Sequence, residues 1–152
     1  MTDSDRGTEG ALPPPGLPIA LVRPIVERAL AEDLAWGDTT TALLVPAELV
    51  AEGRVIARAA GIVAGLPVAE LAFRLVEPDI QVRLLARDGD TVQPGQELAA
   101  ITGPARGILT AERVALNFLQ RLSGIATLTA RFVAAVQGTG ARIVDTRKTT
   151  PG

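Results

Sequence analysis

The segment from Gly107 to Gly140 constrains the fold most, because its apolar residues recur at the spacing of an amphipathic helix. Thr110 is placed to act as an N-cap. The negative charge of Glu112 would then lie in the first turn, where it interacts favourably with the positive end of the helix dipole. Ser123 and Gly124 predict a break, followed by a second helical segment that ends at Gly138. The broad apolar face of the first segment has to be covered by other elements, and it consists of Ile108, Ala111, Ala115, Phe118, Leu119 and Leu122.

The beginning of the chain predicts a tail, a helix and a turn. Residues 1–18 combine charges, glycine and four prolines, which is typical of a flexible tail. Order is expected from Ile19, with a helix whose main part starts at Pro24, since proline is tolerated in the first turn. Asp38 precedes three threonines, which predicts a capped turn with Trp36 as its apolar anchor.

The middle of the chain predicts strands around one short helix. Residues 52–65 are rich in β-branched side chains and indicate a strand that continues past a bend at Gly61. Residues 66–78 read as a helix stopped by Pro78, and residues 79–104 as antiparallel strands with tight turns. The turn segment 88–101 resembles the hammerhead turns of biotinyl and lipoyl carrier domains. The only lysine of the chain, Lys148, lies far from that segment, which argues against a carrier role.

Composition excludes several kinds of chemistry. The chain contains no cysteine and no histidine, which removes disulfides, thiolate metal sites and Ser-His or Cys-His catalysis. A net charge of -2 provides no general basic field for nucleic acid or for an anionic membrane. No apolar run is long enough to span a bilayer, and the N-terminus is acidic where a secretory signal is basic. We therefore expect a cytoplasmic protein that binds neither nucleic acid nor membranes.

Two groups of residues are candidates for binding an anion. Arg113, Asn117 and Arg121 are four residues apart and share one stripe beside the apolar helix face. Arg147 and Lys148 follow an apolar pair and are flanked by threonines, at the position where α/β folds place ligand-binding loops. Guanidinium and ammonium groups suit carboxylates and phosphates. The same patterns also fit a solvated helix face and a basic loop, so the residues alone leave both interpretations open.

Three motifs in order resemble the quinolinate phosphoribosyltransferase family: "EDLAWGDTT", "GPARGILTAERVALNFLQRLSGIATLT" and "DTRKTTPG". The resemblance covers residues 19–152. It implies a pentosyltransferase of NAD biosynthesis that joins quinolinate to phosphoribosyl pyrophosphate, releasing pyrophosphate and CO2 and giving nicotinate mononucleotide. It also implies Mg2+ with phosphoribosyl pyrophosphate and a homodimer in which each N-terminal domain faces the partner's barrel.

The resemblance also implies the fold and the site. We expect an α+β fold, in which an N-terminal α/β sandwich with a hammerhead-like antiparallel sheet precedes a truncated α/β barrel. The expected parts are a disordered tail (1–18), the sandwich (19–107), linking helices (108–138) and the first barrel strand with its active-site loop (139–152). The implied substrate-binding residues are Arg113, which would reach quinolinate across the dimer interface, Thr146, Arg147 and Lys148, with Lys148 also catalytic.

The chain is expected to be an N-terminal fragment without activity of its own, because further substrate contacts and the Mg2+ ligands would lie beyond Gly152. Two alternatives to this function remain open. One is the molybdenum-utilisation paralogue of the same fold, and the other is a non-catalytic dimerisation domain.

Overall fold

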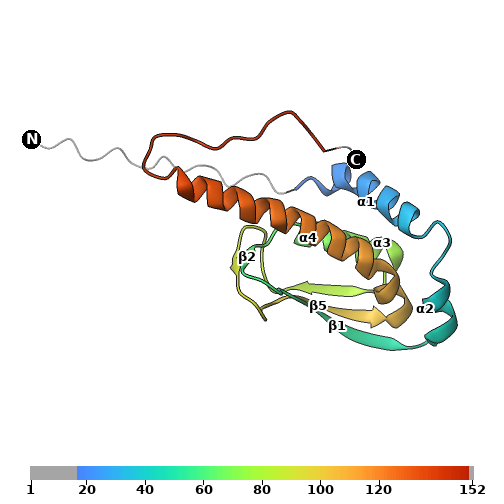
Figure 1. Cartoon of the computed structure of the whole chain (residues 1–152). Coiled ribbons are helices and arrows are strands. Elements are labelled where there is room, and N and C mark those ends of the chain that lie inside the picture. The colour runs from blue at the N-terminus through green and yellow to red at the C-terminus, as the bar shows by residue number, and fades with distance from the viewer. Residues whose placement is uncertain (1–16, 151–152) are drawn as a thin grey trace, which may run out of the picture.

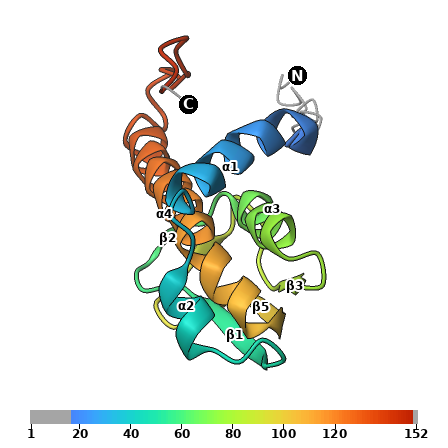
Figure 2. The same cartoon turned by 90° about the vertical axis from the view of Figure 1, so that its right-hand side faces the viewer.

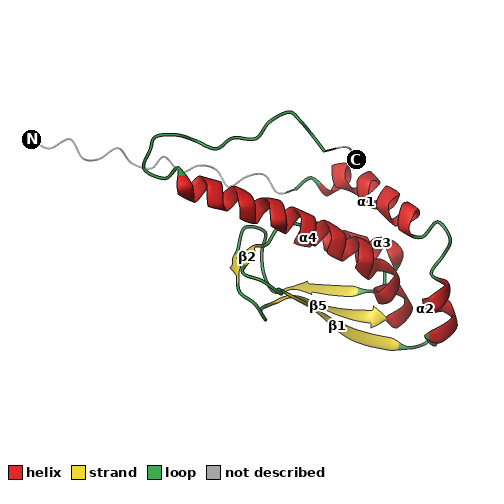
Figure 3. Ribbon diagram, in the orientation of Figure 1, coloured by secondary structure: helices red, strands yellow, loops and turns green. Residues whose placement is uncertain are grey.

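A computed structural model describes residues 17–150, which form four helices and five strands within that range (Figures 1 and 3). The tail expected at residues 1–18 falls almost entirely outside the described residues. The elements in chain order are α1 (Ile19–Asp33), α2 (Thr39–Leu44), β1 (Val50–Ile56), β2 (Gly61–Ile62), α3 (Leu66–Val76), β3 (Gln81–Leu84), β4 (Thr91–Val92), β5 (Glu97–Pro104) and α4 (Ala105–Ala135).

An antiparallel sheet in the order β1-β5-β3 supports the helices, and a second pair, β2 and β4, lies beside it. The helices α3 and α4 cover one face of the three-stranded sheet (Figures 1 and 2). Ile80 is fully buried, and Val82 and Leu84 point toward the same core, as their alternation in the sequence predicts. The expected combination of an antiparallel sheet with packed helices is therefore confirmed.

The core lies between the helices and the sheet. Its largest fully buried side chains are Val26, Val63, Leu66 and Ile80. The short helix predicted at residues 66–78 is confirmed as α3, which begins after Gly65 and ends before Pro78. Gly65 has φ +99°, a backbone conformation that favours glycine, and this allows the chain to turn directly from β2 into α3.

The long helix α4 is continuous from Ala105 to Ala135, so two predictions about it were wrong. It starts five residues before Thr110, whose hydroxyl instead donates to the Asp38 carboxylate at 3.2 Å. It does not break at Ser123 and Gly124. The hydroxyl of Ser123 bonds to the backbone of Ala64, between β2 and α3, rather than to its own helix, and Gly124 faces open space, so neither residue disturbs the helical backbone.

Two hydroxyls on α4 bond to the backbone of β2 and of Ala64, which follows this strand. Ser123 Oγ accepts from the Ala64 N–H at 3.0 Å and donates to the Ala64 carbonyl at 3.2 Å. Thr127 Oγ1 accepts from the Ile62 N–H at 2.9 Å and donates to the Ile62 carbonyl at 3.4 Å. Four residues of helix rise about 6 Å and two residues of strand about 6.6 Å, so the spacings match. Side chains of α4 thus take the place of a neighbouring strand along β2.

The close approach of α4 to β2 depends on glycine. A Cβ at Gly61 would lie 2.6 Å from Thr127 Oγ1, and a Cβ at Gly65 would lie 2.7 Å from Leu122 Cδ1. The strand predicted to continue past a bend at Gly61 within residues 52–65 is instead divided, because the chain leaves the three-stranded sheet after Ile56 and forms β2 in the second sheet under α4.

Two details of the first helix and turn also differ from expectation. Pro24 lies inside α1 rather than at its start, because Ile19 and Val22 pack against the core and stabilise a turn before the proline. Trp36 was wrongly predicted as an anchor, since it is 95% exposed. The turn is fixed instead by backbone bonds, such as Gly37 N–H to the Leu34 carbonyl at 2.8 Å, and by the Asp38 cap.

The strand expected in the last segment is not formed. Residues 139–150 follow α4 as irregular chain, and Figure 1 shows them running back above this helix. A strand needs a neighbour for its backbone groups, and the part of the chain that the structure describes offers none there. None of the helices within residues 17–150 combines the length and apolarity needed to cross a membrane.

Candidate active site

Arg113 of α4 forms an ion pair with the last residue of α1. Its Nε and Nη2 groups both donate to Oδ2 of Asp33, at 3.1 and 3.0 Å. The Arg113 side chain is 54% exposed and the Asp33 side chain 29% exposed. These hydrogen bonds from the guanidinium, together with the charge of Asp33, raise the pKa of Arg113 above its usual value. Arg113 is therefore a permanently charged group that is oriented by a carboxylate and still open to solvent.

A second carboxylate stands beside this pair. Asp38 caps α2 by accepting from the Thr41 N–H at 3.1 Å, and its other oxygen accepts from Thr110. The hydrogen bonds from Thr41, first that of its side chain and then that of its backbone, lower the pKa of Asp38, and Thr110 and the charge of Arg113 act in the same direction. The predicted capped turn is thus confirmed, and it joins α2 to α4 close to Arg113.

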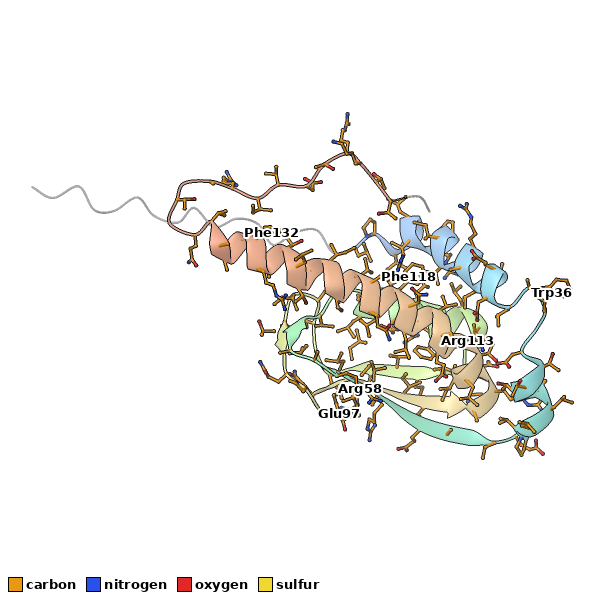
Figure 4. All side chains as sticks on the ribbon, viewed as in Figure 1. Trp36, Arg58, Glu97, Arg113, Phe118 and Phe132 are labelled. Atoms are coloured by element: carbon orange, nitrogen blue, oxygen red, sulfur yellow. The ribbon has the colours of Figure 1, made fainter. Side chains whose placement is uncertain are left out.

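The stripe predicted on α4 lines a cleft between α1 and α4 with a volume of about 800 Å³. Arg113, Asn117 and Arg121 all face this cleft, together with apolar groups that include Ile25 and Phe118. Figure 4 shows Arg113 and Phe118 on the same helix, toward α1. Charged groups from α1 complete the lining, and they are Arg28, Glu32 and Asp33. The lining combines apolar side chains with three arginines and two carboxylates, so the cleft has a net positive charge that suits an anionic ligand.

The loop residues predicted for the same function lie elsewhere. Thr146, Arg147 and Lys148 are exposed in the irregular segment that leaves the far end of α4 (Figure 1). The Thr146 hydroxyl accepts from the Lys148 N–H at 3.2 Å, a local turn contact. No hydrogen bond or ion pair within residues 17–150 joins this loop to Arg113. One chain therefore does not bring the two predicted halves of the site together.

Sequence reasoning missed Asp33 and Arg28 as part of the site. Asp33 lies within the first quoted motif, but it is separated from Arg113 by 80 positions, and its local pattern gives no sign of that pairing. Arg28 sits on the exposed side of an amphipathic helix, where arginine is ordinary. Residues 17–150 contain no group of three or more acidic side chains that could hold a metal ion.

Comparison with known proteins assigns the chain to a family. Residues 38–123 match the family model described as quinolinate phosphoribosyl transferase, N-terminal domain, and residues 125–152 match the C-terminal domain model of the same family. The two matches meet at Ser123 and Gly124, inside α4.

Curated relatives agree with this assignment. A nicotinate-nucleotide pyrophosphorylase [carboxylating] of Mycobacterium leprae is 47% identical over 133 residues, covering 86% of this chain and 47% of the relative. The chloroplastic protein of the same name from Arabidopsis thaliana is 41% identical, covering 91% of this chain and 40% of the relative. The chain thus spans about half the length of the curated relatives it matches.

Solved structures share the fold. NadC from Streptococcus pyogenes superposes with a TM-score of 0.86 at 37% identity, covering 90% of this chain and 49% of that one. The nicotinate-nucleotide pyrophosphorylase from Francisella tularensis gives a TM-score of 0.82 at 35% identity, covering 89% and 48%. On the domain match, the sequence identities and the shared fold together, the chain belongs to the quinolinate phosphoribosyl transferase family.

Proposed function

We propose that the chain is the N-terminal part of a quinolinate phosphoribosyltransferase. The reaction joins quinolinate to phosphoribosyl pyrophosphate and gives nicotinate mononucleotide, pyrophosphate and CO2, as a step of NAD biosynthesis. The cleft between α1 and α4 is the observation that carries this proposal, since its lining combines apolar side chains with three arginines. We prefer this reaction to that of the molybdenum-utilisation paralogue because relatives at 47% and 41% identity are named for it.

Arg113 is the proposed contact to a quinolinate carboxylate. Quinolinate is a dianion, and phosphoribosyl pyrophosphate adds several negative charges, so cations have to offset the repulsion between the two substrates. The guanidinium offers paired donors that fit a planar carboxylate. Its exposed position on the cleft leaves it accessible to a ligand.

The terminal loop supplies the second group of proposed contacts. Thr146, Arg147 and Lys148 would line the substrate site, with Lys148 as the catalytic cation near the reacting groups. Because the loop does not contact Arg113 within one chain, we propose a homodimer in which Arg113 completes the site of the partner. The dimerisation-only alternative shares this geometry and differs from the proposal in predicting no turnover.

Magnesium belongs to the proposal as a companion of phosphoribosyl pyrophosphate, where it would stabilise the departing pyrophosphate. Residues 17–150 lack a carboxylate cluster that could hold it, and we assign it no ligand among them. We propose a cytoplasmic location for the enzyme, although the names of plant relatives include chloroplastic and mitochondrial forms.

The test uses the full-length product of the reading frame that contains this sequence. Purified protein should form nicotinate mononucleotide and release CO2 only when quinolinate and phosphoribosyl pyrophosphate are both present. Arg113→Ala should lower kcat/KM for quinolinate by about 30- to 1000-fold, the scale for removing a charged partner of the substrate from a polar site. Arg131→Ala is the matched control, because Arg131 is an exposed arginine on the same helix outside the cleft.

Three results would contradict the proposal or its parts. A full-length protein without this activity would exclude the reaction, and equal effects of the two substitutions would exclude the role of Arg113. Residues 1–152 alone should form no product, since the chain spans about half of its relatives. CO2 release by that chain, dependent on both substrates, would show that the remaining half is not needed.

A further inference from the structure

We propose that Asp33 is a positioning residue, which holds the guanidinium of Arg113 so that its outer edge faces an incoming carboxylate. The inference rests on the proposed function, because it assigns to Asp33 a role in quinolinate binding through Arg113. It concerns a residue of α1 that lies at the cleft but is not itself suited to contact an anionic substrate.

The hydrogen bonds of Arg113 support this assignment. A guanidinium has five N–H donors in a fixed plane. Asp33 takes the Nε donor and one Nη2 donor, both through the single oxygen Oδ2. Nη1 makes no hydrogen bond to any residue between 17 and 150. The edge formed by Nη1 and Nη2 is therefore open, and this is the edge that binds a carboxylate with two parallel hydrogen bonds.

The place of Asp33 in its own helix offers no other reason for a carboxylate. Asp33 is the last residue of α1, where the helix dipole disfavours negative charge. Glu32 precedes it, and α1 has no basic residue in its last turn. The local helix would thus be better served by a neutral or basic residue. The partner that compensates the charge of Asp33 is Arg113, on another helix.

The negative charge of Asp33 weakens the attraction of Arg113 for an anion, and other arginines of the cleft offset this loss. Asp33 neutralises part of the attraction between Arg113 and an anion. Arg28 and Arg121 line the same cleft, and neither forms an ion pair among the described residues. These two arginines can attract the substrate. Asp33 orders the Arg113 side chain before the substrate arrives, so that binding loses less conformational entropy.

The experiment compares Asp33→Asn with Glu32→Gln in the full-length protein. Both variants remove one carboxylate from the same cleft, but only Asp33 bonds to Arg113. Asp33→Asn should raise the KM for quinolinate by about 3- to 10-fold, the scale for leaving one long side chain unordered before binding. The KM for phosphoribosyl pyrophosphate and the thermal midpoint should change little, and Asp33→Glu should restore part of the loss. Glu32→Gln should lower the KM for quinolinate, because it removes a negative charge from the cleft without releasing Arg113.

A second background separates positioning from general electrostatics. In an Arg113→Lys protein, Asp33→Asn should have no further effect on the KM for quinolinate, because a lysine ammonium has no planar edge to present. In residues 1–152, the N–H proton on Nε of Arg113 should exchange faster with solvent when Asp33 is replaced by Asn, because a neutral amide oxygen is a weaker acceptor than a carboxylate.

Each other result decides against the proposal. A lower KM in Asp33→Asn would mean that Asp33 competes with the substrate, and an unchanged KM would make the ion pair a purely structural contact. An equal rise in Glu32→Gln would mean that any cleft charge has the same effect. If the full-length parent protein does not use quinolinate, the proposed function is wrong. If Nε of Arg113 is unprotected from exchange in the parent chain, the positioning role of Asp33 is wrong, and the proposed function is unaffected.

Discussion

Replacement of Thr127 by valine tests whether hydroxyls on α4 stabilise the edge of β2. Valine keeps the shape of threonine but removes the oxygen that accepts from the Ile62 N–H at 2.9 Å and donates to the Ile62 carbonyl at 3.4 Å. The N–H then faces a methyl group in a partly buried site. Leaving a buried donor without a partner costs about 1 to 3 kcal/mol. Because this site is only partly buried, we expect a loss of about 1 to 2 kcal/mol in the free energy of unfolding.

The assay is urea denaturation of residues 1–152 followed by far-ultraviolet circular dichroism. Thr129→Val is the matched control, since Thr129 lies on the exposed side of the same helix and should change stability by less than about 0.5 kcal/mol. Ser123→Ala should cost about as much as Thr127→Val, because its hydroxyl bonds to both backbone groups of Ala64. Equal stability of Thr127→Val and the parent chain would refute the idea that these hydroxyls replace a neighbouring strand.

Three further predictions concern the backbone at Gly65, the stability of the fold at low pH and the exposure of Trp36. Gly65→Ala should destabilise the chain by about 1 to 3 kcal/mol in the same denaturation assay, because alanine is strained at φ +99°. The pKa of Asp38 is lowered in the fold, so its stabilising contribution is complete above its unfolded pKa of about 3.9 and is lost as the pH falls through the lower folded value. Asp38→Asn, which retains a good N-cap, should therefore flatten the fall in stability on acidification, and an unaltered slope would contradict this. Trp36 should be quenched by iodide as readily as free indole, since it is 95% exposed, and a protected emission would mean that something covers it.

The sequence predicted the elements that follow simple periodic patterns. The helix at residues 66–76 and the alternation of Ile80, Val82 and Leu84 depend on neighbours in the chain, and both were correct. The continuity of α4 was not predictable in this way. Ser123 and Gly124 look like a break until the contact between the Ser123 hydroxyl and the Ala64 backbone is known, and Ala64 lies 59 positions earlier. Local propensity was overridden by a tertiary contact.

In the candidate site too, features set by local spacing were predictable and contacts between distant residues were not. The stripe of Arg113, Asn117 and Arg121 follows from helical spacing, and the structure places all three at one cleft. The partner of Arg113 could not be predicted, because Asp33 comes from another helix, 80 positions away. The proposed contribution of Lys148 is still a prediction, since the described residues around the terminal loop give it only local contacts.

The helix α4 determines where the proposed site groups lie, more than the sheet does. Arg113 projects from its N-terminal half, Ser123 and Thr127 fix its middle to β2, and the terminal loop leaves from its C-terminal end. A continuous helix moves nearly as one body, so a shift of α4 against β2 would move the donors of Arg113 and the origin of the loop together. The two family domain matches meet inside this helix. Loss of the hydroxyl contacts should therefore weaken the proposed binding of quinolinate by the full-length protein as well as its stability, although neither hydroxyl lies in the cleft.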